Sequence, residues 1–275
     1  MAEVKIITIC ENHVEPSFGL RASHGFSLYI EFNGKRIIYD VGQDDSFIKN
    51  AKLLNIDITK CEHIIISHGH FDHSGALSDA ICFISPERII IQKSAFDKKY
   101  RSSEGKLSDI GIGSELKEMN FNYAYEKSFL LDDNIWALVN TPKTAECFSS
   151  KEPLFVERDG KIIDDDFSDE ISLAIKTSRG LIVLSACSHR GCYNILAHAK
   201  KITGVERIAC FIGGTHLCFK HRDDAHKELN EINKMNIGSY FLGHCSGLEN
   251  IFHLKSIVAN PNDVHVNYVG RKILI

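Results

Sequence analysis

A short run with three histidines and one aspartate constrains the fold of this chain more than any other feature. The run is Ser67-His68-Gly69-His70-Phe71-Asp72-His73-Ser74-Gly75, and it directly follows the apolar segment 63–66. This order predicts a buried strand, a loop and then the start of a helix. His68 and His70 can project together from a turn at the end of the strand. Asp72 and His73 can face a second metal ion from the helix N-terminus.

The residue types in this run favour metal binding. Imidazole and carboxylate groups suit zinc, iron and manganese, and catalytic metal sites leave one position open for water. A polar surface loop is the alternative, but it needs neither the alternation of histidines nor a strand of β-branched residues before it. We therefore expect one or two divalent metal ions, zinc first, with iron or manganese as the alternatives.

The composition sets limits on the possible partners. With 275 residues, of which 44% are hydrophobic and 25% charged, the chain can form one large α/β domain. The net charge of −4 argues against a nucleic-acid partner. No apolar run is long enough to span a bilayer, and residues 1–5 lack the apolar core of a secretory signal. The nine cysteines form no Cys-x-x-Cys pair suited to a structural zinc site, and their odd number without a secretory signal indicates reduced thiols. We expect a cytoplasmic protein with no membrane partner.

Strand and helix patterns alternate along most of the chain, which predicts the α/β class. Asn33-Gly34 predicts a tight hairpin turn. Strands are expected at 4–10, 26–32, 36–40, 64–67, 88–92, 129–131, 136–139, 172–177, 181–186, 208–212 and 240–242. Helices are expected at 47–54, from the histidine run to residue 80, at 194–201 and at 225–235.

The middle of the chain, about 94–170, is the least regular part. Exposed loops are expected at 102–106 and 164–168 because both stretches are polar. The region forms either an embedded cap or strands with long connections. We favour strands with a partly mobile flap, inside a single domain that covers residues 1–275.

The histidine run resembles the H-x-H-x-D-H signature of the metallo-β-lactamase superfamily, and the resemblance extends along most of the chain. Segment 38–42 is similar to the strand that ends in Asp-x-Gly in that superfamily. Further segments resemble the dihydropterin–ribofuranosylaminobenzene phosphate synthases of methanopterin synthesis, namely 24–27, 67–70, 187–191, 213–217 and 244–247. The resemblance implies a four-layer αββα sandwich, in which two mixed β-sheets are flanked by helices and the metals lie at one edge.

The resemblance also implies roles for particular residues. His68 and His70 would ligate the first metal, and Asp72 and His73 would serve the second. His189 and His244 follow expected strands within Gly- and Ser-rich turns, where sites are common, so we expect them to complete the ligand set.

Two residues are candidates for the chemical step. We expect Asp72 to take part in it. His216 would bind substrate or transfer a proton, with a hydrogen-bonded structural histidine as the alternative.

The chain departs from the superfamily pattern in two places. The stretch 140–146 has no histidine where many members carry a Gly-His-Thr turn. His189 stands where many members have a bridging aspartate. A carboxylate can span two cations with two oxygens, whereas a neutral imidazole offers one lone pair. The resemblance therefore implies an asymmetric site with one weakly held metal, which puts efficient hydrolysis in doubt.

Each of three residues near the expected ligands has two possible roles. Asp40 either orients a ligand histidine or is a turn residue before Gly42. Cys187 and Cys245 are either core residues or thiols that bond to a ligand or replace one.

Three functions agree with these observations. The first is a metal-dependent hydrolase that acts on a phosphorylated or otherwise anionic small molecule through a metal-activated water. The second is a transferase that joins a dihydropterin methyl diphosphate to ribofuranosylaminobenzene phosphate. The third is a metal-dependent binding or sensing protein. The basic stretch 97–101 is either solvated surface or a contact for a phosphate-bearing substrate. The oligomeric state is left open.

Overall fold

The computed structural model describes residues 4–16, 19–144 and 153–275, and the chain divides into two compact units. Unit 1 comprises Met1–Ala124, Pro153–Asp169 and Tyr268–Ile275, and unit 2 comprises Tyr125–Glu152 and Glu170–Asn267. Each unit is built from chain segments that are not continuous in sequence. The single domain over residues 1–275 stays a prediction.

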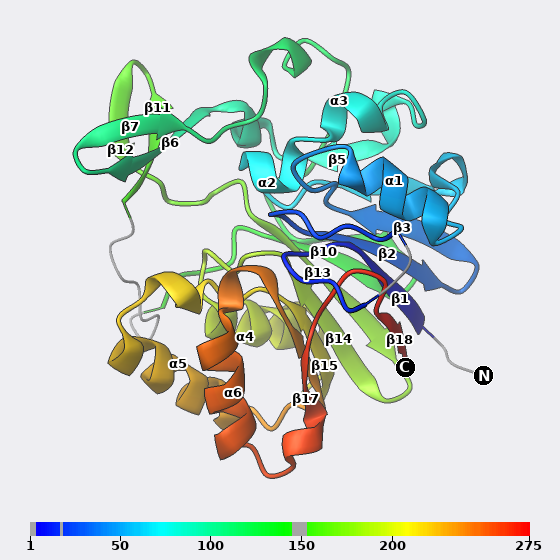
Figure 1. Cartoon of the computed structure of the whole chain (residues 1–275), viewed down its shortest axis with the longest axis vertical. Helices are drawn as coiled ribbons and strands as arrows, with labels where there is room; N and C mark the ends of the chain where they lie inside the picture. Colours follow the sequence, from blue (N-terminus) through cyan, green and yellow to red (C-terminus); the bar gives the residue numbers. More distant parts are fainter. Residues whose placement is uncertain (1–3, 17–18, 145–152) are drawn as a thin grey trace. The chain divides into compact units, whose positions relative to one another are not determined.

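Unit 1 is built on a mixed seven-stranded sheet in the order β18-β1-β2-β3-β4-β5-β8 (Figure 1). Strands β18, β1, β2 and β3 pair antiparallel, and β3, β4, β5 and β8 pair parallel. The strands are β1 (Val4–Cys10), β2 (Ser27–Phe32), β3 (Lys35–Tyr39), β4 (His63–Ile65), β5 (Ile89–Ile91), β8 (Asn122–Tyr123) and β18 (Lys272–Leu274). Parallel neighbours need long crossover connections. Helices α1 (Ser46–Leu53), α2 (Phe71–Ser74) and α3 (Leu77–Ala80) lie in two of these connections.

The core of unit 1 follows from the alternation of side chains along its strands. On β1, Ile7 and Ile9 belong to one buried cluster, and Ile64 and Ile66 on and after β4 belong to the same cluster. The cluster also contains Phe47 and Ala51 of α1 and Leu77 and Ala80 of α3. Burial of one apolar sheet face against amphipathic helices stabilises this layer.

A second, four-stranded antiparallel sheet in unit 1 has the order β12-β11-β6-β7. Its strands are β6 (Lys98–Ser103), β7 (Lys106–Asp109), β11 (Leu154–Arg158) and β12 (Lys161–Asp164). The prediction of a loop at 102–106 is wrong at both ends, because Ser102 pairs with Leu107 and Ser103 pairs with Lys106. Polar strands lack the apolar alternation that reveals a strand in a sequence. The middle of the chain therefore contains a small sheet.

Unit 2 is built on another mixed seven-stranded sheet, in the order β17-β16-β15-β14-β13-β10-β9. Strands β9, β10, β13 and β14 pair antiparallel, and β14, β15, β16 and β17 pair parallel. The strands are β9 (Phe129–Asp132), β10 (Ile135–Val139), β13 (Ile171–Thr177), β14 (Gly180–Ser185), β15 (Ile208–Gly213), β16 (Tyr240–Leu242) and β17 (Val264–Val266). The helices are α4 (Cys192–Thr203), α5 (Arg222–Lys234) and α6 (Leu248–Ile257).

The three helices of unit 2 pack against its parallel strands (Figure 1). Leu196 of α4, Leu229 of α5 and Leu254 of α6 share one buried cluster with Val183 of β14 and Phe211 of β15. Helix crossovers on a parallel sheet place the carboxyl ends of β14, β15 and β16 at one edge. That edge carries the later histidines of the sequence.

Short 3-10 helices complete the described elements. They are η1 (Ile58–Lys60), η2 (Pro86–Arg88), η3 (Lys93–Phe96), η4 (Ser114–Leu116), η5 (Leu217–Phe219), η6 (His244–Ser246) and η7 (Pro261–Asp263). The predicted α/β class, with two mixed sheets bordered by helices, is confirmed. Helix α6 and strands β17 and β18 were not predicted.

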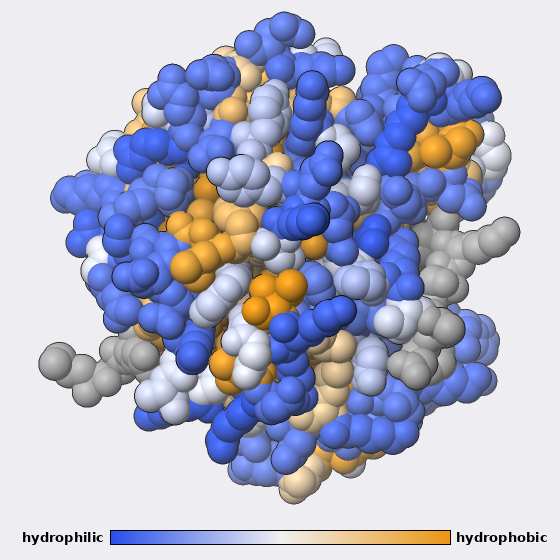
Figure 2. Space-filling model, turned by 180° about the vertical axis from the view of Figure 1, so that it is seen from behind, coloured by the Kyte–Doolittle hydropathy of each residue, from blue (hydrophilic) through white to orange (hydrophobic). Residues whose placement is uncertain are grey.

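The surface in Figure 2 is mainly hydrophilic, with hydrophobic patches of limited size between charged side chains. Among the described residues, no helix combines the length and the apolar character that crossing a membrane would require.

Candidate metal centre

The histidine run lies where the sequence predicted, at the end of β4. Ile66 is fully buried, residues 68–69 form a bend, and His70 precedes the first residue of α2. Gly69 is required in this bend, because a Cβ there would lie 2.1 Å from the Ala95 carbonyl oxygen. The close approach to residue 95 therefore fixes the path of the loop between His68 and His70.

The four side chains of the run are buried together. His68 and His73 are fully buried, and His70 and Asp72 are 6% and 9% exposed. Nε2 of His68 lies 3.1 Å from Nδ1 of His70. The ring centroids of His68 and His73 lie 4.3 Å apart. Within unit 1, the structure therefore brings the first four predicted ligands into one cluster.

Asp40 organises this cluster from the end of β3. Its Oδ2 atom accepts a hydrogen bond from Nδ1 of His73 at 2.7 Å. Its two oxygens also accept the Ser67 amide N–H at 2.6 Å and the Ser67 hydroxyl at 2.7 Å. The expected contact between Asp40 and a histidine of the run is therefore present, with His73 as the histidine. Carboxylates in this position orient histidine ligands in metal sites.

The hydrogen bonds assign the tautomers of two histidines. Because His73 donates from Nδ1 to Asp40, its Nε2 atom carries a lone pair. The Ser67 hydroxyl donates to Asp40, so its oxygen accepts from Nδ1 of His68 at 2.9 Å. Nε2 of His68 therefore also carries a lone pair, and it faces His70.

This donor set fits a divalent metal ion. Two nitrogens bound to one tetrahedral zinc at ~2.0–2.1 Å lie about 3.3 Å apart, close to the 3.1 Å between His68 and His70. Burial, followed by the nearby His73 and His70, holds the pKa of His68 well below its usual range. A neutral imidazole is the form that binds metal.

Asp72 lies at the open side of the cluster. Its Oδ2 atom lies 3.5 Å from Nε2 of His73 and 3.3 Å from Nε2 of the more exposed His24. Asn12 accepts the Gly25 amide N–H at 3.1 Å, so it supports the loop that carries His24. Asp72 is thus the member of the run that is closest to solvent.

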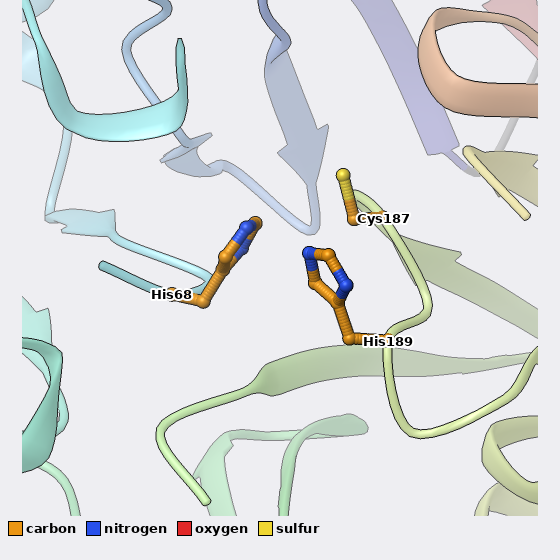
Figure 3. A group of neighbouring side chains, drawn as sticks. All are labelled: His68, Cys187 and His189. Carbon is orange, nitrogen blue, oxygen red and sulfur yellow. The ribbon is translucent and has the colours of Figure 1, made fainter. Parts of the chain in front are cut away.

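In unit 2, the other predicted residues follow three adjacent parallel strands. Cys187 and His189 lie on the loop after β14 (Figure 3), His216 follows β15 and His244 follows β16. His189 and His216 have ring centroids 4.2 Å apart. His216 and His244 both have left-handed backbone, with φ of 55° and 48°. Such φ values are uncommon outside glycine and often mark functional sites.

Glu170 holds the loop after β14, and the sequence did not reveal this role. Its two carboxylate oxygens accept the amide N–H groups of His189 and Arg190, at 2.7 and 2.8 Å. The side chain is 4% exposed. Its partners lie 19 and 20 residues further along the chain, so only folding brings its side chain to residues 189 and 190.

The two cysteines lie close to His216. Ligand atoms of Cys187, His216 and Cys245 all lie within 4.8 Å of one another. The Sγ atom of Cys245 accepts the His216 amide N–H at 3.3 Å and lies 3.6 Å from the Cys187 carbonyl oxygen. Both thiols therefore border the loops that carry the later histidines.

Part of the predicted site stays a prediction. The ligand roles of His68, His70, Asp72, His73, His189 and His244, and the chemical roles of Asp72 and His216, are not tested by this geometry. In the stretch 140–146, Thr141 accepts a hydrogen bond from Nε of Arg190 at 2.7 Å. Ala145 and Glu146 lie outside the described residues.

Comparison with known proteins agrees with this fold and with these motifs. The sequence model of the metallo-beta-lactamase superfamily matches residues 20–134. The chain belongs to the metallo-β-lactamase superfamily.

Among its relatives is the 7,8-dihydropterin-6-methyl-4-(beta-D-ribofuranosyl)-aminobenzene-5'-phosphate synthase of Methanocaldococcus jannaschii. The two sequences are 29% identical, and the match covers 90% of each chain. An uncharacterised protein of the same organism is 32% identical, over 71% of this chain and 73% of the relative.

A solved structure described as a metal-dependent hydrolase of the beta-lactamase superfamily has the same fold. The TM-score is 0.85 at 27% identity, and the match covers 99% of both chains. The expected metallo-β-lactamase fold is therefore confirmed.

Proposed function

We propose that this protein is a metal-dependent hydrolase that acts on a phosphorylated or otherwise anionic small molecule. The observation that carries the proposal is the pair of histidine nitrogens 3.1 Å apart, on His68 and His70, beside a His73 that Asp40 orients. When bound, a divalent metal ion, with zinc as the first expectation and iron or manganese as alternatives, would supply a water of near-neutral pKa and a centre that polarises a phosphoryl or acyl oxygen.

The four side chains of the histidine run have different proposed roles. In this proposal His68 and His70 hold the first metal, and Asp72 and His73 hold the second. Asp40 fixes the ring of His73 by accepting its Nδ1 proton. Asp72 is also the candidate acid or base, because His24 lies 3.3 Å from its Oδ2 atom and is half exposed. A proton taken up at Asp72 can therefore pass through His24 to solvent.

The later histidines have separate proposed roles. His189 and His244 complete the ligand set, and His216 binds substrate or transfers a proton. Glu170 supports this assignment for His189, because it fixes the backbone of that loop through two short hydrogen bonds. Catalytic groups need such rigid support to keep their geometry.

A transferase is the second candidate, and one specific observation favours it. The Methanocaldococcus jannaschii relative, which matches over 90% of both chains, carries the name of a synthase. In that reaction class, the site would stabilise a departing diphosphate while a second substrate takes the place of water.

Product analysis on the zinc-loaded protein separates the two candidates. The protein is incubated with single phosphomonoesters, phosphodiesters and lactones, and separately with a dihydropterin methyl diphosphate together with ribofuranosylaminobenzene phosphate. The hydrolase proposal predicts turnover of a single substrate, with one oxygen of ¹⁸O-labelled water in the product. A condensed product that forms only when both substrates are present, and contains no ¹⁸O, would instead establish the transferase.

Variants link either activity to the metal cluster. We expect His68→Ala to lose zinc and turnover together, whereas His13→Ala, at an exposed histidine of the same unit, keeps both. Full activity in metal-free protein, or in His68→Ala, would contradict the proposal. Zinc binding without turnover of any substrate would favour the sensing function.

A further inference from the structure

A buried ion-pair cluster lies directly behind the histidine loop in unit 1. Lys99 of β6 is fully buried, and its Nζ atom donates to Oδ2 of Asp165 at 2.7 Å and to Oδ1 of Asp169 at 3.1 Å. The side chains of all three residues have no exposed surface or almost none. The basic stretch 97–101 is therefore not simply solvated surface, because its central lysine is inside the protein.

Asp169 connects this cluster to the predicted metal ligands. Its second oxygen, Oδ2, accepts the amide N–H of Gly69 at 2.8 Å. Gly69 is the residue between His68 and His70, and a Cβ at this position would lie 2.1 Å from the Ala95 carbonyl oxygen. The peptide between the two histidines is thus bound by the Asp169 carboxylate and packs closely against the backbone of residue 95.

The same segment also reaches the ring of His70. The ring of Phe167 lies 6.0 Å from that of His70, edge to face, and Nζ of Lys99 lies 5.8 Å from the centroid of the Phe167 ring. Oδ1 of Asp165 accepts the Phe167 amide N–H at 2.8 Å, which fixes a residue with left-handed backbone. Residues 165–169 therefore contact both the main chain and a side chain of the histidine loop.

Stability alone gives a poor account of this arrangement. Desolvation of buried charges costs more than their attraction returns in many proteins, and apolar replacements of similar volume are often neutral or stabilising. Burial would lower the pKa of Lys99, but Asp169 and Asp165 outweigh that effect and raise it, so the lysine keeps its charge. A charged lysine can hold the Asp169 carboxylate in one orientation.

We propose that Asp169 is a positioning residue for the metal centre: oriented by Lys99, it holds the Gly69 amide so that His68 and His70 face one metal ion. This inference rests on the proposed metal-binding function. It assigns a purpose to the small sheet of β6, β7, β11 and β12, which supplies Lys99 and leads into residues 165–169. In this proposal the Asp169 carboxylate acts through its hydrogen bonds to Lys99 and Gly69 and is not itself a metal ligand.

The test is zinc affinity, measured by competition with a chromophoric chelator on folded protein. In Asp169→Asn a single carboxamide oxygen must serve either Lys99 or Gly69, so we expect zinc binding to weaken about 10- to 100-fold, as for other residues that orient metal ligands. Asp165→Asn is the matched control, because it removes a carboxylate from the same buried cluster without touching the loop. Its zinc affinity should stay within about threefold of that of the parent. This should hold even if the thermal midpoint of Asp165→Asn falls as far as that of Asp169→Asn.

A rescue experiment separates positioning from general stability. In Lys99→Gln/Asp169→Asn the cation is gone and the carboxamide oxygen is available to Gly69, so zinc affinity should return to that of Lys99→Gln. Lys99→Gln/Asp169→Ala lacks the acceptor and should bind zinc about 10- to 100-fold more weakly. Both double variants lack the lysine, so neither leaves a buried cation short of a carboxylate partner. The comparison between them therefore still tests the proposal if Asp169→Asn does not fold.

The outcomes distinguish this inference from the function on which it rests. If the parent binds zinc and Asp169→Asn binds it equally well, or if Asp165→Asn loses as much affinity as Asp169→Asn, the positioning role is wrong and the metal function stands. If the parent binds none of zinc, iron and manganese, both are wrong.

Discussion

Asp40 illustrates how much one residue contributes to the candidate centre. Its backbone has a φ of 62°, and its carboxylate accepts three hydrogen bonds, from His73 and from the amide and hydroxyl of Ser67. A left-handed conformation costs a non-glycine residue free energy, which the surrounding contacts must offset. The three hydrogen bonds offset this cost and hold the Asp40 side chain in one orientation.

We predict that Asp40→Asn weakens zinc binding about 10- to 100-fold, because the carboxamide has one acceptor oxygen for three donors. Asp44→Asn, four residues away and exposed, serves as the control. Zinc titration of both variants is the measurement. Equal zinc affinity in Asp40→Asn and the parent would show that the ring of His73 needs no partner.

The cysteines also allow a prediction at this scale. Burial raises the pKa of the Cys10 and Cys192 thiols, so both stay protonated and shielded in the folded protein. Cys82 and Cys218 are exposed. Among the cysteines within the described residues, brief treatment with iodoacetamide at neutral pH should label Cys82 and Cys218 first, as read by peptide mass spectrometry. Labelling in urea, where every thiol reacts, is the reference, and early labelling of Cys10 in native protein would contradict the described burial.

At the scale of secondary structure elements, helices α5 and α6 contact each other through a stacked pair of histidine rings. His226 and His253 stack with centroids 3.5 Å apart and an interplanar angle of 3°. Burial, followed by the charges of His226 and Arg222, lowers the pKa of His253. Protonation of this ring would place a positive charge against an imidazole and beside a guanidinium.

The lowered pKa predicts a pH-dependent stability with a defined sign. Below an unfolded-state pKa of about 6.5, the unfolded chain binds a proton that folded His253 resists. Stability is therefore complete above that pH and falls as the pH decreases through the folded pKa. His253→Phe keeps the stack and should lose less stability than the parent between about pH 7.5 and 5.5. Urea unfolding at both pH values, with His13→Phe as control, tests this, and equal losses in all three proteins would refute it.

The sequence predicted elements well where the signal was local. Strand β1 matches its predicted bounds, and Asn33 and Gly34 form the hairpin turn with positive φ. Strand β18 was missed because its partner β1 lies at the other end of the chain and residues 272–274 carry little pattern of their own. Helix α6 was missed although Leu248, Ile251 and Leu254 have helical spacing.

The same distinction separates the predicted parts of the site from the missed ones. His68, His70, Asp72 and His73 were found because their spacing within six residues carries the signal. The contact of Asp169 with Gly69 joins residues 100 positions apart, so no local sequence pattern predicts it. Glu170 is a similar case, because its partners lie 19 and 20 residues away.

For the molecule as a whole, the central prediction concerns metal stoichiometry. His189→Ala should weaken the first metal and His244→Ala the second, each by at least about tenfold, since loss of a direct ligand exceeds the effect of a residue that orients one. Metal analysis after dialysis, combined with zinc titration, measures both. His265→Ala, at a histidine stacked on Phe241, is the control. Two tightly bound equivalents in each variant would exclude these histidines as ligands.

The discontinuous course of the chain has a consequence for how the protein is made. Strand β1 is synthesised long before β18, which is one of its two neighbours in the sheet. Segment 153–169, which contains β11 and Asp169, also emerges after residues 125–152 of unit 2. Unit 1 therefore cannot complete its hydrogen bonding until residues 272–274 have been synthesised, although domains commonly fold in order of synthesis. Before that point one edge of β1 is unpaired, and nascent chains stalled before residue 272 should depend on chaperones that shield strand edges.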